Sequence, residues 1–355
     1  MSLHARITVT RIARYGKATP GLYLWRRLSA SLVGVARNDG AHDSNFGSAA
    51  LDWSVTQCVM HARVVFKRTP NVRHAQMNVV VRDKADYHQQ TDQRMNKHFV
   101  VPEWSVRQKL ALACRMLAAD GHDSGLAGQL SARAERPGTY YMLRFGLGLE
   151  EITAANLLLV DDDLNVLEGE GMPNPSNRFH LWIYRAKPHV RSIMHTHSPY
   201  VSALSMIGVP LAVAHMDTSL FHDDCAWLSE WPGTPIGDEE GRIISEAIGD
   251  KRSILLAHHG QLTACTTVEE AAVLAIFIER AARLQLMAMS AGKIQAIDPE
   301  LAKEAHDYRL KQRAIAATFF YYARRALRQD SSVIGDGPTA VEAECHAAPS
   351  ISQPA

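Results

Sequence analysis

The chain has 355 residues, of which 46% are hydrophobic and 21% are charged, a composition typical of a soluble globular protein. Its net charge of +1 gives no overall field for nucleic acid or an anionic membrane, and no apolar run approaches the roughly 18 residues that cross a bilayer. The five cysteines are scattered and form no Cys-x-x-Cys pair, which argues against a disulfide framework and favours a reducing, cytoplasmic location.

Both ends of the chain differ in composition from the middle. Residues 1–98 begin with arginines and a lysine, have no acidic residue before Asp39, and show little sustained periodicity. An Arg-rich start is compatible with an organelle transit peptide, but a poorly ordered extension or a misassigned start codon is the preferred interpretation. Residues 329–355 have the composition of a disordered tail. We therefore expect one structured domain over 99–328.

Within this domain, segments with helical spacing alternate with short apolar runs typical of strands. The predicted helices, in chain order, cover 103–120, 174–187, 199–207, 238–249, 267–291 and 300–327. The predicted strands cover 128–133, 139–145, 156–161, 190–197 and 253–260. The helix after Thr267 has the clearest signals, with Glu270 completing a capping box and Gly292 as its stop. Interleaved strands and helices favour the α/β class, with a sheet between layers of helices.

The predicted strand "VRSIMHTH" ends in His195 and His197. Residues i and i+2 of a strand share one face of the sheet, so the two imidazoles can bind a single ion. A His-x-His pair alone is a weak signal, because two polar residues at a strand end are more common than a metal site.

A second apolar run, "SILLAHHG", also ends in histidine, at His258 and His259, followed by Gly260. Successive strand residues point to opposite faces, so only one of these histidines can share a site with the first pair. Three nitrogen ligands with open coordination positions are typical of a catalytic metal rather than a structural one. The alternative is that His259 is a hydrogen-bonded core histidine.

The run "FHLWIYRAKPHVRSIMHTHSPYVSALSMIGVPL", the later "LLAHHGQLTACTTVEEAAVLAIFIERAARLQ" and their spacing resemble the class II aldolase/adducin family. The resemblance covers about residues 103–292 and extends to proteins like fuculose-phosphate aldolase. It implies a three-layer αβα sandwich with a mainly antiparallel central sheet, usually in a homotetramer with active sites between subunits. It also implies a divalent metal ion, zinc first and manganese or iron as alternatives, bound by His195, His197 and His259.

The chain departs from this family where the catalytic carboxylate is expected. Sugar-phosphate aldolases of the family read Pro-Ser-Ser-Glu before the "RFH" helix, and the Glu binds the metal or acts as the base. Here Ser176 follows Pro173, Asn174 and Pro175. A serine hydroxyl is a poor base unless another group activates it.

Two further residues are candidates for the missing acid–base role. His180 lies on the helix after Ser176, and Asp217, next to His215, lies in a loop that approaches the metal in the family. A structural role for His180, or a role as a fourth ligand, remains an alternative. For the Asp- and His-rich loop, the alternative is simple solvation.

The family's phosphate-binding elements are also altered. Its Gly-x-x-Gly-Asn turn ends here in Gln129, and its Thr-Pro-Thr-Gly segment reads Leu-Arg-Phe-Gly around Arg144. Small hydroxyl donors are lost, while a guanidinium suits a carboxylate. Arg144, Gln129 and Asn174 are therefore the predicted substrate-binding residues, with a surface salt bridge as the alternative for Arg144. The substrate is expected to be non-phosphorylated, such as a hydroxy-acid, a keto-acid or an aromatic acid.

The leading hypothesis is a metal-dependent carbon–carbon lyase, of the aldolase or decarboxylase type, acting on a small-molecule substrate rather than on nucleic acid or a membrane. Loss of carbon dioxide generates a carbanion without a base, which tolerates Ser176 in place of Glu. A non-heme iron oxygenase on the same fold is one alternative, since three histidines leave positions for substrate and dioxygen. A non-catalytic, adducin-like binding protein is the other.

Overall fold

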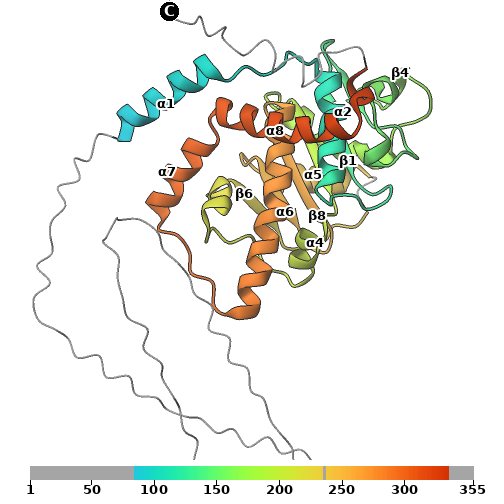
Figure 1. Cartoon of the computed structure of the whole chain (residues 1–355). Helices are drawn as coiled ribbons and strands as arrows, with labels where there is room; N and C mark the ends of the chain where they lie inside the picture. The colour runs from blue at the N-terminus through green and yellow to red at the C-terminus, as the bar shows by residue number, and fades with distance from the viewer. Residues whose placement is uncertain (1–83, 235–236, 336–355) are drawn as a thin grey trace, which may run out of the picture. The chain divides into compact units, whose positions relative to one another are not determined.

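A single open sheet with helices on both faces forms the core of the chain (Figure 1). The computed structural model describes residues 84–234 and 237–335. Within these ranges the sheet has eight strands in the order β4-β3-β2-β1-β5-β8-β7-β6. Neighbouring strands are antiparallel except β6 and β7, which are parallel. The predicted αβα sandwich with a mainly antiparallel sheet is therefore confirmed.

The strands of this sheet are short. Their bounds are β1 Gln129–Arg133, β2 Thr139–Met142, β3 Leu158–Asp161, β4 Val166–Glu168, β5 Ser192–Thr196, β6 Cys225–Leu228, β7 Ser253–Leu256 and β8 Gly260–Cys265. The α-helices are α1 Lys84–His98, α2 Val106–Ala119, α3 Arg178–Ala186, α4 Pro199–Met206, α5 Asp238–Ala247, α6 Val268–Ala291, α7 Pro299–Arg309 and α8 Gln312–Gln329. Short 3₁₀ turns include η3 Pro175–Asn177, η4 Met216–Phe221 and η5 Ser331–Ile334.

Helices α2, α6 and α8 cover one face of the sheet (Figure 1). Helices α3 and α5 cover the other face. The first layer packs a cluster rich in alanine and leucine onto residues such as Leu130 and Met194. The second layer places Phe179 and Ile183 of α3 against residues such as Ile193. Alternation along β5 therefore sends Ile193 and His195 toward α3, because residues two apart share a face.

The described residues include elements on both sides of the expected domain, 99–328. Helix α1 precedes it, and η5 follows it with Val333 and Ile334 buried in the core. The remainder of the predicted N-terminal extension, residues 1–83, and of the tail, residues 336–355, lies outside the described residues. Among the described helices, none is both long and apolar enough to cross a membrane.

The sequence pattern misplaced several elements. The single helix expected over 300–327 is two helices, α7 and α8, which meet at Leu310 and Lys311. Strands β4, β6 and β8 were not predicted. The run "SILLAHHG" is a strand only to Leu256, and its histidines form the turn that leads into β8.

Candidate metal centre and active site

His195, His197 and His259 lie together, each with a ring nitrogen within 4.8 Å of the others. The Nε2 atoms of His195 and His197 are 3.0 Å apart, and each ring centroid lies between 4.6 and 4.9 Å from the other two. His195 lies in β5 and His197 directly follows its last residue, Thr196, and residues two apart in an extended chain point to the same side. These three residues are the predicted metal ligands, and the fold brings all of them to one place.

His259 reaches the group from the tight turn between β7 and β8 rather than from a strand. Its neighbour His258 adopts a positive φ of 57° and is exposed, so only one of the two histidines faces the site. A Cβ atom on Gly260 would lie 2.4 Å from the Thr196 carbonyl oxygen and 3.1 Å from Cδ2 of His197. Glycine is therefore required there because the end of β5 passes against the turn.

The three imidazoles are neutral at neutral pH, which is the form that binds a metal. Burial lowers the pKa of His195 well below its ordinary value, and His259 and His197 lower it further. Burial also lowers the pKa of His197, and burial followed by the His197 charge lowers that of His259 to about 4. Imidazole nitrogens are suitable ligands for zinc, iron or manganese, and they suit zinc and iron better than manganese.

A second layer of hydrogen bonds fixes the orientation of the ligands. Nδ1 of His195 donates to the backbone oxygen of Gln261 at 2.8 Å, which leaves the Nε2 lone pair for a metal. On the opposite face, Thr196 is held by His122 and by the Gln261 side chain, each at 2.9 Å from its Oγ1. Sequence reasoning missed this support, although Gln261 directly follows His-His-Gly and is itself fully buried in β8.

A small pocket beside the histidines contains all three predicted substrate-binding residues, Gln129, Arg144 and Asn174. In the antiparallel pairing of β1 with β5, Gln129 lies directly opposite His195, so their side chains share a face. Residues 144–145 are held against 172–173 by a backbone bridge and by a hydrogen bond from Phe145 N to Met172 O. The pocket is also lined by Asn177, which the sequence reading did not select.

Arg144 is half-buried, and among the described residues it forms an ion pair with no carboxylate. Its side chain instead lies along Gly171, where an added Cβ would be 2.9 Å from the guanidinium Nε. A surface salt bridge, the alternative reading of this arginine, is therefore not found within the described part of the chain. A guanidinium left in this state at a pocket is suited to an anionic ligand.

His180 and Ser176 lie near this pocket, at the start of α3. His180 is fully buried, its Nδ1 is 2.7 Å from Ser131 Oγ, and its Nε2 has no partner among the described residues. Burial lowers its pKa to about 3. The Phe179 ring lies between His180 and the histidine cluster, with its centroid 4.5 Å from that of His180 and 5.2 Å from that of His195. Ser176 is half-buried in η3, its N–H donating to Asn174 Oδ1.

Asp217 lies in η4 and is engaged by two arginines. Its carboxylate is 2.7 Å from Nε of Arg280 on α6 and 3.5 Å from Nη1 of Arg309 at the end of α7. Partial burial raises its pKa, but the Arg280 hydrogen bond and both arginine charges outweigh this effect and keep it below the usual range. A carboxylate in this state is a weaker base than a free one.

Comparison with known proteins agrees with this fold. The model of the class II aldolase and adducin N-terminal domain matches residues 108–286. "Decarboxylase NovR" of Streptomyces niveus is 31% identical over 197 residues, covering 54% of this chain and 73% of that protein. "4-hydroxy-3-prenylphenylpyruvate oxygenase/4-hydroxy-3-prenylbenzoate synthase" of Streptomyces roseochromogenus subsp. oscitans is 30% identical, covering 54% and 71%. The solved structure "L-fuculose 1-phosphate aldolase from Glaciozyma antarctica PI12" superposes with a TM-score of 0.59 at 29% identity, covering 64% of this chain and 90% of that one.

Proposed function

Because the chain belongs to the class II aldolase and adducin family, we propose that it is a metal-dependent carbon–carbon lyase acting on a non-phosphorylated hydroxy- or keto-acid. One observation supports this proposal above all others. Three neutral imidazoles converge beside a pocket whose arginine has no carboxylate partner among the described residues. The guanidinium can bind a carboxylate, and a metal on the histidines would act as a Lewis acid. The two together suit a substrate that carries a carboxylate next to a reacting carbonyl or hydroxyl group.

Each candidate residue has a distinct role in this proposal. His195, His197 and His259 hold a divalent ion, zinc first and manganese or iron as alternatives. When bound, this ion polarises a substrate oxygen and stabilises the negative charge left by carbon–carbon cleavage. Arg144, together with Gln129 and Asn174, orients the acid in the pocket.

The proton transfers are assigned to His180, Ser176 and Asp217 in that order of support. His180 has a buried Nε2 without a partner among the described residues, which can hold or pass a proton near the reacting centre. Asp217 is paired with two arginines, so it can act as a proton acceptor only if those ion pairs break. Decarboxylation needs no base to remove a carbon-bound proton. It is therefore the preferred reaction with Ser176 in the position where the family's aldolases carry Glu, and the name of one relative includes "Decarboxylase".

The first test is elemental analysis of the purified protein beside the His195→Ala/His197→Ala double variant. We expect about one equivalent of zinc or manganese per chain, lost in the double variant and in His259→Asn. The matched control is His258→Asn, because His258 is exposed next to His259 and asparagine tolerates its positive φ. Metal absent from the wild-type protein contradicts the proposal and leaves an adducin-like binding protein.

The second candidate is a non-heme iron oxygenase, because one relative at 30% identity is named an oxygenase. Three histidines without a carboxylate leave coordination positions for substrate and dioxygen. One equivalent of iron together with oxygen consumption on a panel of aromatic keto-acids favours this candidate. Product formation without oxygen favours the lyase.

The assembly and location are also proposals. A homotetramer with active sites at subunit contacts fits the family, as does a cytoplasmic protein whose partner is a small-molecule substrate rather than nucleic acid or a membrane. Sedimentation velocity on the wild-type protein tests the tetramer.

A further inference from the structure

A cleft at the opposite end of β5 from the histidines is lined by three arginines. Arg133 ends β1, Arg136 lies in the turn between β1 and β2, and Arg191 directly precedes β5. The cleft has a volume of about 190 Å³, which is room for several water molecules at about 30 Å³ each. Because Arg191 precedes β5 and His197 follows it, roughly 20 Å of extended chain, at about 3.3 Å per residue, separates the cleft from the candidate metal centre.

Arg133 is fixed in position by several contacts. Its Nε donates to the backbone oxygen of Val190 at 2.9 Å, and its Nη2 donates to that of Tyr184 at 2.6 Å. The guanidinium carbon lies 4.7 Å from the centroid of the Tyr184 ring and 5.5 Å from that of Tyr140, whose hydroxyl is 3.4 Å from Nη1. Since a guanidinium carries more N–H donors than these contacts use, some remain for a ligand.

Arg191 lies directly opposite Arg133. The register of β1 with β5 pairs Ala132 with Ser192, and the next pair outward is joined by a hydrogen bond of 2.8 Å from Arg133 N to Arg191 O. Opposite residues of an antiparallel pair share one face, with Cβ atoms about 5 Å apart, and like charges in these positions destabilise the sheet. An anion bound between the two side chains would relieve this repulsion.

Arg136 is carried by a turn that is itself fixed. Thr139 N and Thr139 Oγ1 both donate to the Arg136 carbonyl oxygen, at 3.2 and 2.6 Å, and Gly138 adopts a positive φ of 72°. Arg136 and Arg191 are exposed, and neither side chain makes a hydrogen bond or ion pair with another described residue. Both side chains can therefore bind a ligand without losing an internal partner.

Two carboxylates lie close to the cleft, and each already accepts a hydrogen bond from a tyrosine. Glu135 accepts from the Tyr141 hydroxyl at 2.7 Å, and Asp162 accepts from the Tyr140 hydroxyl at 2.7 Å. Among the described residues, none of the three arginines forms an ion pair with these or any other carboxylates. The cleft therefore has an excess of positive charge and free guanidinium donors.

We propose that this cleft binds a phosphate group, with Arg133, Arg136 and Arg191 donating to its oxygens. The guanidinium fork matches phosphate geometry, and such charge-assisted hydrogen bonds are stronger than neutral ones. A tetrahedral dianion presents acceptor oxygens in several directions, so arginines from three segments can bind one charged centre. A monocarboxylate such as propionate has neither the charge nor the acceptors for this cleft.

The ligand is free phosphate or a small phosphate monoester. Because the cleft lies at the other end of β5 from the histidines, the inference is independent of the proposed function and of the acid that binds there.

The test is calorimetric titration of the purified protein with inorganic phosphate, glycerol 2-phosphate and succinate at constant ionic strength, because salt screens exposed charges. We expect both phosphates to bind more tightly than succinate, which is a dicarboxylate. Arg136→Gln and Arg191→Gln should each weaken phosphate binding at least about tenfold, the loss expected for hydrogen bonds to a charged group. The matched controls, Arg144→Leu and His259→Asn, alter the other end of the sheet and should leave this binding unchanged. Tighter binding of glycerol 2-phosphate than of phosphate identifies a monoester as the ligand, and the reverse identifies the free ion.

A second measurement separates a ligand-binding arginine from a structural one. Because Arg191 faces a like charge, the urea midpoint of Arg191→Gln in chloride buffer should equal or exceed that of the wild type. Replacing chloride by phosphate should raise the midpoint of the wild type more than that of the variant, since a ligand that binds only the folded state stabilises it. The general stabilising effect of phosphate acts on both proteins and cancels in the comparison.

The outcomes that overturn this inference are distinct from those that overturn the proposed function. Phosphate binding that survives in both Arg136→Gln and Arg191→Gln contradicts the site, as does binding that only Arg144→Leu removes. Succinate binding as tightly as phosphate contradicts the assignment of a phosphate group. Loss of phosphate binding in the two cleft variants of a protein that cleaves no acid supports the site and contradicts only the lyase.

Discussion

Arg144 is the residue whose environment most directly suggests the substrate, since its guanidinium has no carboxylate partner among the described residues. We expect Arg144→Leu to weaken binding of carboxylate ligands roughly ten- to hundredfold, the range for a lost hydrogen bond to a charged group. The urea midpoint should change little, because no internal ion pair is broken. Calorimetry with propionate measures the effect, and Arg136→Leu, exposed beyond the other end of β2, is the control. Unchanged affinity in Arg144→Leu would remove this arginine from the site.

Gly260 is the glycine where the turn that carries His259 passes against Thr196 and His197. Its Cβ position lies 2.4 Å from a backbone oxygen of β5, an approach that cannot relax through a side-chain rotation. Gly260→Ala should therefore cost about 1–3 kcal/mol in the free energy of unfolding and displace His197 enough to reduce metal content. Gly292→Ala, where nothing lies within 4 Å, is the matched control. Full metal occupancy in Gly260→Ala would refute this account.

At the residue scale, the sequence was informative where chemistry requires one residue type at a fixed spacing. His195 and His197 share a face because of strand periodicity, and His259 was selected because it ends a second apolar run. Asn177 and Gln261 were missed, since only the three-dimensional structure shows that one lacks a hydrogen-bond partner and that the other supports His195 and Thr196.

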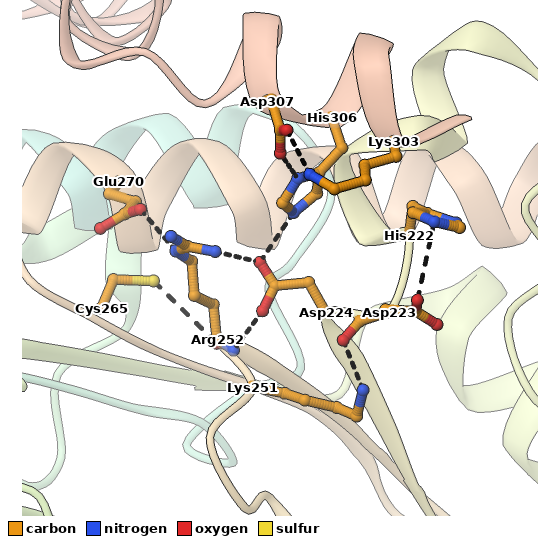
Figure 2. A network of polar contacts seen from close by, with 10 residues as sticks. All are labelled: His222, Asp223, Asp224, Lys251, Arg252, Cys265, Glu270, Lys303, His306 and Asp307. Atoms are coloured by element: carbon orange, nitrogen blue, oxygen red, sulfur yellow. Dashed lines mark hydrogen bonds and ion pairs between the residues drawn. The ribbon is translucent and has the colours of Figure 1, made fainter. Parts of the chain in front are cut away.

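At the scale of elements, helix α7 is joined to the sheet edge by the charged network in Figure 2. Asp224, next to β6, is 6% exposed, pairs with Arg252 and lies 3.2 Å from His306 of α7. Arg252 also pairs with Glu270 of α6 at 2.9 Å, and His306 with Asp307 at 2.9 Å. One buried carboxylate thus connects three segments that are distant in sequence.

This network predicts a pH dependence of stability. The Asp224 hydrogen bond is the main cause that raises the pKa of His306, against partial burial, with Asp307 adding to it. A raised folded-state pKa contributes stability that is present below the unfolded value near 6.5 and is lost as the pH rises through the folded value. From pH 6 to 9 the wild type should therefore lose about 1 kcal/mol more than His306→Gln in urea unfolding.

The control for this experiment is Lys303→Gln, which removes an exposed ion pair with Asp307 on the same helix. It should leave the pH dependence between 6 and 9 intact, because exposed pairs contribute little. Parallel curves for the wild type and His306→Gln would show that His306 does not anchor α7.

Element boundaries show why part of the fold could not be obtained from the sequence. Helices α2 and α6 were predicted well because each has a sustained apolar face and a side-chain N-cap, at Ser105 and Thr267. Strand β6 lies at the sheet edge and only one of its four residues is buried, whereas β7, which has the same length and was predicted, is buried throughout. The break between α7 and α8 has neither Pro nor Gly, and the apolar spacing continues across it.

For the whole molecule, the proposed metal ligands come from parts of the sheet that are far apart in the sequence. His195 lies in β5, His197 directly follows its last residue, and His259 occupies the turn that leads into β8, so an ion bound by all three would link two central neighbouring strands. Binding to the folded state alone stabilises it by RT ln(1 + [metal]/Kd), which is about 2.7 kcal/mol at a hundredfold excess over Kd. We therefore expect chelation to lower the urea midpoint, and zinc to restore it, in the wild type and in His258→Asn.

The same titration on His259→Asn separates a specific ion from general binding to surface groups. The urea midpoint of this variant should lie near that of the chelated wild type and rise little on zinc addition, because two imidazoles bind zinc far more weakly than three.

The acid pocket is formed by β1, the segment around Arg144 and the start of α3, and β1 pairs with β5, which carries His195. An ion that holds the end of β5 in place should therefore also hold the pocket residues in place. Zinc should consequently tighten propionate binding in the wild type and not in His259→Asn. A zinc-induced rise in midpoint that is equal in both proteins would place the ion elsewhere and separate the acid pocket from the histidines.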